Sequence, residues 1–165
     1  MGGKNLATDT NTSGGASGGN IIITGNASVT ASSKGNGAGI GGGGASTHTN
    51  LPNAGAGGDI TISGNASVAA TSEGNGAGIG GGGSPGVGAA GAGGDIRISD
   101  TASVTASSKG NGAGIGGGGS PGTGTAGAGG NIRISGTPII IAETENTSAV
   151  DMGPDRKSTR LNSSH

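Results

Sequence analysis

The chain has 165 residues and a formal net charge of −1; 44 residues are Gly, none is Phe, Tyr, Trp or Cys, and only 28% are hydrophobic. Because proteins use Gly at only about 7%, this composition excludes an ordinary globular core and leaves a low-complexity chain, a fibrous chain or a repeat solenoid. The absence of Cys excludes disulfides and thiolate metal sites, and no stretch approaches the roughly 20 apolar residues of a membrane span.

Four copies of one repeat follow a short N-terminal segment. They start at Gly18, Gly57, Gly93 and Gly129, with spacings of 39, 36 and 36 residues. The extra residues of the first copy fall within residues 45–54, and length variation confined to one place indicates a surface loop. We therefore predict three regions. They are a disordered or incomplete segment at 1–17, the repeats at 18–150 with the last one truncated, and a disordered tail at 151–165.

Each copy begins with an alternation of apolar and polar residues, as in Ile60 and Ile62 on either side of Thr61. A Ser-Gly-Asn turn signal and a second alternation over residues 66–71 follow, which together predict a strand, a corner and a strand. In the second strand the even-numbered residues are apolar and share one face. The "GAGIGG" stretch at 76–81 continues the alternation and predicts a third short strand or an extended corner.

Three short strands and one loop per period of about 36 residues predict an all-β fold, a right-handed parallel β-solenoid with Gly-rich loops. Each residue would stack on its equivalent in the next coil, about 4.8 Å away. One coil alone buries too few apolar side chains to fold, so stability belongs to the stack. One predicted column alternates in charge and consists of Lys34, Glu73 and Lys109. A second is an amide ladder of Asn36, Asn75 and Asn111. A third is a polar column at the start of the first strand, with Asn20, Asp59, Asp95 and Asn131.

The stretch "GNGAGIGGGG" fills residues 35–44 and recurs unchanged at 74–83 and 110–119. Its glycines fit the G-x-G-x-x-G pattern of dinucleotide-binding loops, which requires a following helix whose N-terminus faces the phosphates. Here "GGGGSPG" or similar sequence follows and cannot start a helix. We therefore expect a structural role, in which Gly lets the backbone run flat at a tight corner or against a loop.

Two acidic residues are candidate calcium ligands. Asp59 in "GAGGDITI" and Asp95 in "GAGGDIRI" resemble the Gly- and Asp-rich turns that bind calcium in nonapeptide β-helix repeats. Their equivalents Asn20 and Asn131 are uncharged, and the nine-residue period is missing. A hydrogen-bonded corner is the alternative interpretation of these positions, and calcium is the only cofactor that the sequence raises.

An outward-facing column of Ile22, Thr61, Arg97 and Arg133 suggests a ligand site. Two arginines on adjacent coils place like charges side by side, which slightly destabilises the sheet. A polymer bearing carboxylates could bridge them through bidentate contacts, and the Ser/Thr rows beside them supply hydroxyls. Thr61, Arg97 and Arg133 are therefore candidate ligand residues, and a solvated face neutralised by neighbouring Asp or Glu is the alternative.

Catalysis has little support in the sequence. The scattered acids and His48, which precedes the tail, form no paired carboxylates, Ser-His pair or metal-ligand cluster along the chain. Acids from different coils can still converge, as they do in solenoid lyases. Mild acidity without aromatic residues also gives no support for nucleic-acid binding. We therefore predict a protein that is not an enzyme, with the substrate-binding part of a polysaccharide lyase as an alternative.

The last eleven residues, "DRKSTRLNSSH" at 155–165, resemble the conceptual translation of a sequencing adapter and are left out of the fold prediction. This tail carries one acid and three bases, so residues 1–154 have a net charge of −3. The match indicates that the chain is a fragment of a longer protein. The start of the chain lacks the apolar segment of a signal peptide, which in a fragment says nothing about secretion.

The stretch "GGDITISGNASVAATSEGNGAGIGGG" resembles the Gly-rich repeats of large secreted or wall-attached bacterial surface proteins, particularly from gut-dwelling Firmicutes. The resemblance covers residues 18–142 and implies a parallel β-helix, an extracellular or cell-surface location and a carbohydrate-binding or adhesin-like role. The positions it carries over are structural: Ile60, Ile62, Val68 and Ile79.

The expected function is therefore a non-catalytic extracellular module of a bacterial surface protein, adhesive or glycan-binding. Its expected partner is an acidic polysaccharide or a glycan of the host or cell wall, and neither nucleic acid nor a membrane span is expected. A purely structural stalk or spacer is the first alternative, and the lyase the second.

Overall fold

The chain is all β in the computed structural model, which describes residues 14–46 and 52–146. Each repeat forms one coil, and coils 1 to 4 start at Gly18, Gly57, Gly93 and Gly129. Coils 1 to 3 each contain three strands, and the described part of coil 4 contains the first two. The strands are β1 (Ile21–Ile23), β2 (Ser28–Ser33), β3 (Ile40–Gly41), β4 (Ile60–Ile62), β5 (Ser67–Ser72), β6 (Ile79–Gly80), β7 (Asp95–Ile98), β8 (Ser103–Ser108), β9 (Ile115–Gly116), β10 (Asn131–Ile134) and β11 (Ile139–Thr144).

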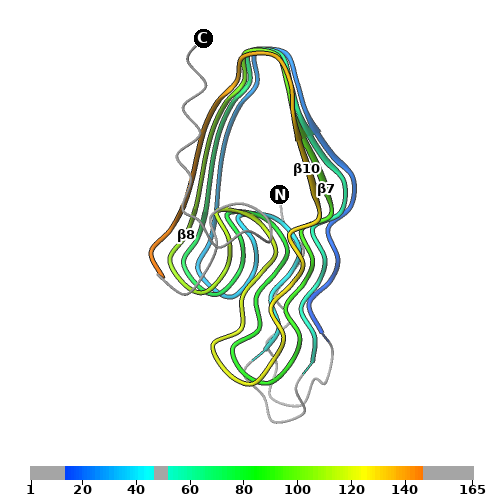
Figure 1. Cartoon of the computed structure of the whole chain (residues 1–165), viewed down its shortest axis with the longest axis vertical. Helices are drawn as coiled ribbons and strands as arrows, with labels where there is room; N and C mark the ends of the chain where they lie inside the picture. The colour runs from blue at the N-terminus through cyan, green and yellow to red at the C-terminus, as the bar shows by residue number, and fades with distance from the viewer. Residues whose placement is uncertain (1–13, 47–51, 147–165) are drawn as a thin grey trace.

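Equivalent strands of successive coils pair in parallel and form three sheets, in the orders β1-β4-β7-β10, β11-β8-β5-β2 and β3-β6-β9. Ile21 pairs with Ile60, Ile60 with Ile96, and Ile96 with Ile132, which reproduces the spacings of 39, 36 and 36 residues. Viewed along the stack, the coils superimpose, and the first two sheets form sides that meet at one corner (Figure 1). The predicted parallel β-solenoid is therefore confirmed.

The core consists of apolar columns enclosed by the three sheets. Ile60, Ile62 and Ile79 of coil 2 are fully buried, and so are their equivalents in coil 3. Val68 is 1% exposed while its neighbour Ser67 faces solvent, because successive side chains of a strand point to opposite faces. Coil 4 keeps the equivalent inward positions, which are all buried: Pro138, Ile140 and Ala142.

The corner between the first and second strands has a left-handed backbone residue in every coil. Coils 1, 2 and 4 use Gly25, Gly64 and Gly136, with φ between +69° and +77°. Coil 3 has Asp100 at this position with φ +61°, a conformation that Asp tolerates better than most residues but less well than Gly. The Asp100 carboxylate accepts a 2.8 Å hydrogen bond from the backbone N–H of Gly64, and this bond offsets part of the cost.

After the third strand, each Gly-rich segment forms one arm of a loop, and a return arm leads into the next coil. Backbone hydrogen bonds join the two arms, and each bond connects a residue of one arm to a residue of the other. The amide of Gly82 donates to the carbonyl of Gly55 over 2.9 Å, the amide of Gly91 to that of Gly82 over 2.8 Å, and the amide of Gly118 to that of Gly91 over 3.0 Å. The arms form a lobe beside the apolar core (Figure 1).

The close approach of the two arms explains why the Gly-rich stretch is repeated. A Cβ atom on Gly42, Gly81 or Gly117 would lie between 1.9 and 2.1 Å from a carbonyl oxygen of the opposite arm. Gly80, at the end of β6, also has φ +132°, and its equivalents in coils 1 and 3 have similar values. Within the described residues no helix follows any copy of the motif. The G-x-G-x-x-G spacing therefore arises from backbone packing, as expected for a structural role.

Residues 14–17 lie in the position of a return arm ahead of coil 1. The amide of Gly15 donates to the carbonyl of Asn53 over 2.9 Å, and the amide of Gly43 donates to the carbonyl of Ala16 over 2.8 Å. The predictions for 1–13 and for the tail at 151–165, which includes the adapter-like residues, lie outside the described residues.

Candidate functional site

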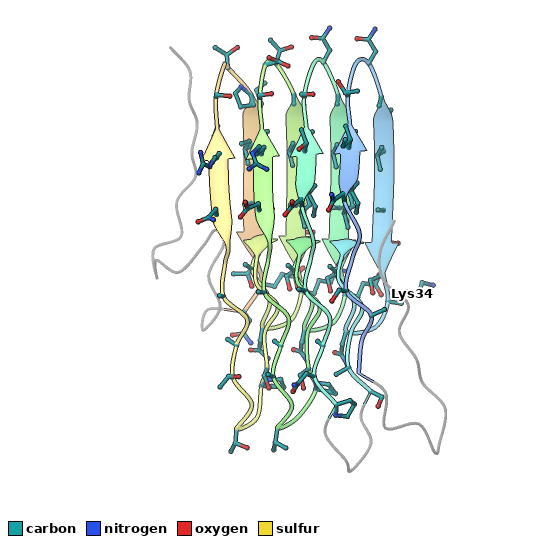
Figure 2. The ribbon with its side chains drawn as sticks, turned by 90° about the vertical axis from the view of Figure 1, so that its right-hand side faces the viewer. Lys34 is labelled. Carbon is teal, nitrogen blue, oxygen red and sulfur yellow. The ribbon has the colours of Figure 1, made fainter. Side chains whose placement is uncertain are left out.

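The predicted ligand residues lie on the outer face of the β1-β4-β7-β10 sheet. Thr61 pairs in register with Arg97, and Arg97 with Arg133. Both arginines are exposed, and Thr61 is half-buried. The structure therefore brings all three into one column, which continues to the exposed Ile22 of coil 1. Figure 2 shows the side chains as rows that cross the coils.

Asp95 connects the arginine column to the polar column beside it. One carboxylate oxygen lies 3.6 Å from Nη2 of Arg97, and the side chains are 38% and 47% exposed. The other accepts a 2.9 Å hydrogen bond from Nδ2 of Asn131. An exposed ion pair of this kind contributes about 0–1 kcal/mol. In coil 4 the uncharged Asn131 occupies the position of Asp95, so Arg133 has no acidic residue two positions before it.

A third row on this face carries hydroxyl groups in every coil. The Ser63 hydroxyl donates a 3.0 Å hydrogen bond to the hydroxyl of Thr24 in coil 1. Ser99 and Ser135 continue the row in coils 3 and 4. The face therefore combines carboxylates, amides, guanidinium groups and hydroxyls in three adjacent rows, all within reach of solvent.

The two candidate calcium ligands lie in one column of this same face. Ile60 pairs in register with Ile96, and Asp59 and Asp95 are the residues immediately before them. The Asp95 carboxylate already contacts Arg97 and Asn131, as in the hydrogen-bonded alternative. Within residues 14–46 and 52–146, no group of three or more His, Cys, Asp or Glu side chains lies close enough to hold a metal ion. The described residues therefore supply no third acidic side chain to Asp59 and Asp95.

The predicted amide ladder is present and runs through all four coils. Nδ2 of Asn75 donates to Oδ1 of Asn36 over 3.2 Å, and Nδ2 of Asn111 donates to Oδ1 of Asn75 over 3.0 Å. Asn146 adds a fourth member, with a 2.5 Å bond to Asn111. The repeat spacing does not predict Asn146 as a member, because Asn146 follows Glu145 directly, whereas a Gly separates Asn36 from Lys34 in coil 1.

Buried hydroxyls make a second line of contacts between coils. The Ser72 hydroxyl donates to the carbonyl of Gly37 over 2.9 Å, and the Ser108 hydroxyl to that of Gly76 over 2.8 Å. Both serines are fully buried at the inward end of the second strand. The amide ladder and these serines therefore hold neighbouring coils together.

The charge-alternating column lies at the end of the second strand. Ser33, Ser72 and Ser108 pair in register, so the residues that follow them, Lys34, Glu73 and Lys109, occupy one exposed column. Thr144 pairs with Ser108, which extends the column to Glu145. Lys34 lies at the coil 1 end of the stack (Figure 2).

His48 lies outside the described residues. Among the residues that the structure describes, no helix is long and apolar enough to cross a membrane.

No protein-family model, no curated protein and no solved structure matches the chain.

Proposed function

We propose that this chain is a non-catalytic repeat module of an extracellular bacterial surface protein, and that it binds glycans through the outer face of the β1-β4-β7-β10 sheet. The observation that supports this function best is the stacking of Thr61, Arg97 and Arg133 in one outward-facing column, in which both arginines are exposed. The carboxylate of Asp95 and the amide of Asn131 lie beside that column. A surface-protein role also agrees with the resemblance of the repeat to Gly-rich bacterial surface repeats.

The chemistry of this face suits carbohydrate. Sugar hydroxyls both donate and accept hydrogen bonds, and the face offers planar donors from the arginines and acceptors from the carboxylates and hydroxyls. Arg133 can also form bidentate contacts with the carboxylate of a uronic acid. The chain has no aromatic residue on which a sugar ring could stack. Binding at each coil is therefore weak, and affinity comes from several coils engaging one polymer.

Retention on immobilised polygalacturonate, an acidic polysaccharide, tests this function. We expect the full chain to be retained and Arg97→Ala with Arg133→Ala to weaken binding by roughly tenfold, because each lost charge-assisted contact contributes about 1.5–3 kcal/mol before solvent screening reduces it. Lys109→Ala, compared with Arg133→Ala alone, is the matched control, since each removes one exposed cation and only Arg133 lies on this face. Equal retention of the double variant, the control and the parent would contradict the proposal.

A structural spacer is the second candidate. It is favoured by the polar side chains that bond from one coil to the next, which include Asn75, Asn111, Ser72 and Ser108. A spacer would show no retention on any polysaccharide while keeping its β-sheet circular dichroism. The same assay also detects a lyase-related role, because cleavage by a lyase would leave new unsaturated ends in the polymer.

A further inference from the structure

Both ends of the described stack present strand edges. Strands β1, β2 and β3 end the three sheets at coil 1, and β10 and β11 end two of them at coil 4. Within the residues that the structure describes, each of these strands has a neighbour on one side only. Such an edge exposes a row of backbone N–H and C=O groups and can pair with another strand.

The hydrogen bonds identify which backbone groups face outward at coil 1. Ile21, Ala27 and Ser33 bond to coil 2 through their backbone groups. In a parallel strand the N–H and C=O of one residue point to the same side, and those of the next residue point to the opposite side. The backbone groups of the even-numbered residues between these bonded residues therefore face away from the stack. Thr30, in the middle of β2, is one of these residues.

The side chains at the two ends are complementary. If a coil 1 stacked on coil 4 with the spacing of the existing coils, Lys34 would meet Glu145 and continue the alternation of charge. Asn36 would meet Asn146 and extend the amide ladder. The same step would cover Ile134, which is 40% exposed at the coil 4 edge. Each of these pairings repeats an alignment of equivalent residues that the parallel register already sets inside the stack.

We propose that two copies of this chain associate head to tail, with the coil 1 edge of one copy, formed by β1 and β2, pairing with the coil 4 edge of the other, formed by β10 and β11. This interface is heterologous, since it joins two different surfaces. Each added copy leaves both kinds of edge open, so association yields a series of oligomers that grows with concentration and does not stop at a closed dimer. The inference does not depend on glycan binding.

Sedimentation velocity of the full chain over a range of concentrations tests the interface. We expect dimers, trimers and larger species to increase with protein concentration. Lys34→Glu and Glu145→Lys each place like charges across the interface and should lower the association constant several-fold, to about tenfold. Mixing the two variants restores opposite charges at each junction and should restore association. Lys109→Glu is the matched control, because it makes the same charge change as Lys34→Glu inside the stack.

Thr30→Pro is a second test that leaves the internal hydrogen bonds in place. Its amide faces outward, and Pro is tolerated on an edge strand where the N–H faces solvent. We expect this variant to keep its β-sheet circular dichroism and to lose most of the association. A chain that stays monomeric at all concentrations would overturn the proposal. So would association that neither Thr30→Pro nor the charge reversals weaken.

Discussion

Replacing Gly81 by Ala tests whether the glycines are required by the contact between the loop arms. A Cβ atom at this position would lie 1.9 Å from the carbonyl oxygen of Gly91. Cβ atoms almost never come within 3.0 Å of another heavy atom, so one arm must move by about 1.1 Å. Neither arm is free to move, since Gly81 donates to the carbonyl of Gly116 over 2.9 Å and Gly91 donates to that of Gly82 over 2.8 Å.

Gly81→Ala adds only one methyl group, but we expect it to lower the free energy of unfolding by a large amount. Overpacking a close-packed site costs about 1–3 kcal/mol, and here the obstacle is hydrogen-bonded backbone, so we expect about 3 kcal/mol. For a chain of this size that loss lowers the melting temperature by about 6–12 °C. Gly86→Ala is the matched control in the same loop, because a Cβ there meets nothing within 4 Å. It should be neutral or stabilising by up to about 1 kcal/mol.

Thermal and urea unfolding, followed by far-UV circular dichroism, measures both variants against the parent chain. Because each coil is stabilised mainly by its neighbours, damage in coil 2 can also broaden the transition. If Gly81→Ala unfolded within about 0.5 kcal/mol of the parent, the range expected of an ordinary surface change, the argument that arm contact requires glycine would be refuted.

Two further predictions concern the polar contacts between coils, and urea unfolding measures both. Asn75→Ala breaks the amide ladder on both sides and should cost about 1–3 kcal/mol, whereas Asn65→Ala, at an exposed corner, should cost less than about 1 kcal/mol. Ser72→Ala removes a buried hydroxyl that bonds to a carbonyl and should cost about 1 kcal/mol, while Ser67→Ala on the outer face should be close to neutral. Equal losses for a variant and its control would contradict either prediction.

The repeat period and the alternation of apolar residues were sufficient to predict the sheets and the core. Stacking equivalent positions also predicts that Thr61, Arg97 and Arg133 share one column, because a parallel register of about 36 residues leaves no other partner for them. A neighbouring acid beside the arginines is one expectation, but the sequence does not identify Asp95 as that acid or predict its second contact, to Asn131. Both contacts depend on which side-chain conformers the neighbouring coils allow.

The sequence by itself determined the coil, its inward and outward faces and the amide ladder of the first three coils, because these follow from a two-residue strand period repeated at a constant spacing. Only the tertiary structure decided three other features. The loop arms meet through their backbones, Asn146 joins the ladder despite its shifted spacing, and Asp100 adopts the left-handed corner. All three arise from contacts between segments about 10 to 36 residues apart, which local patterns do not encode.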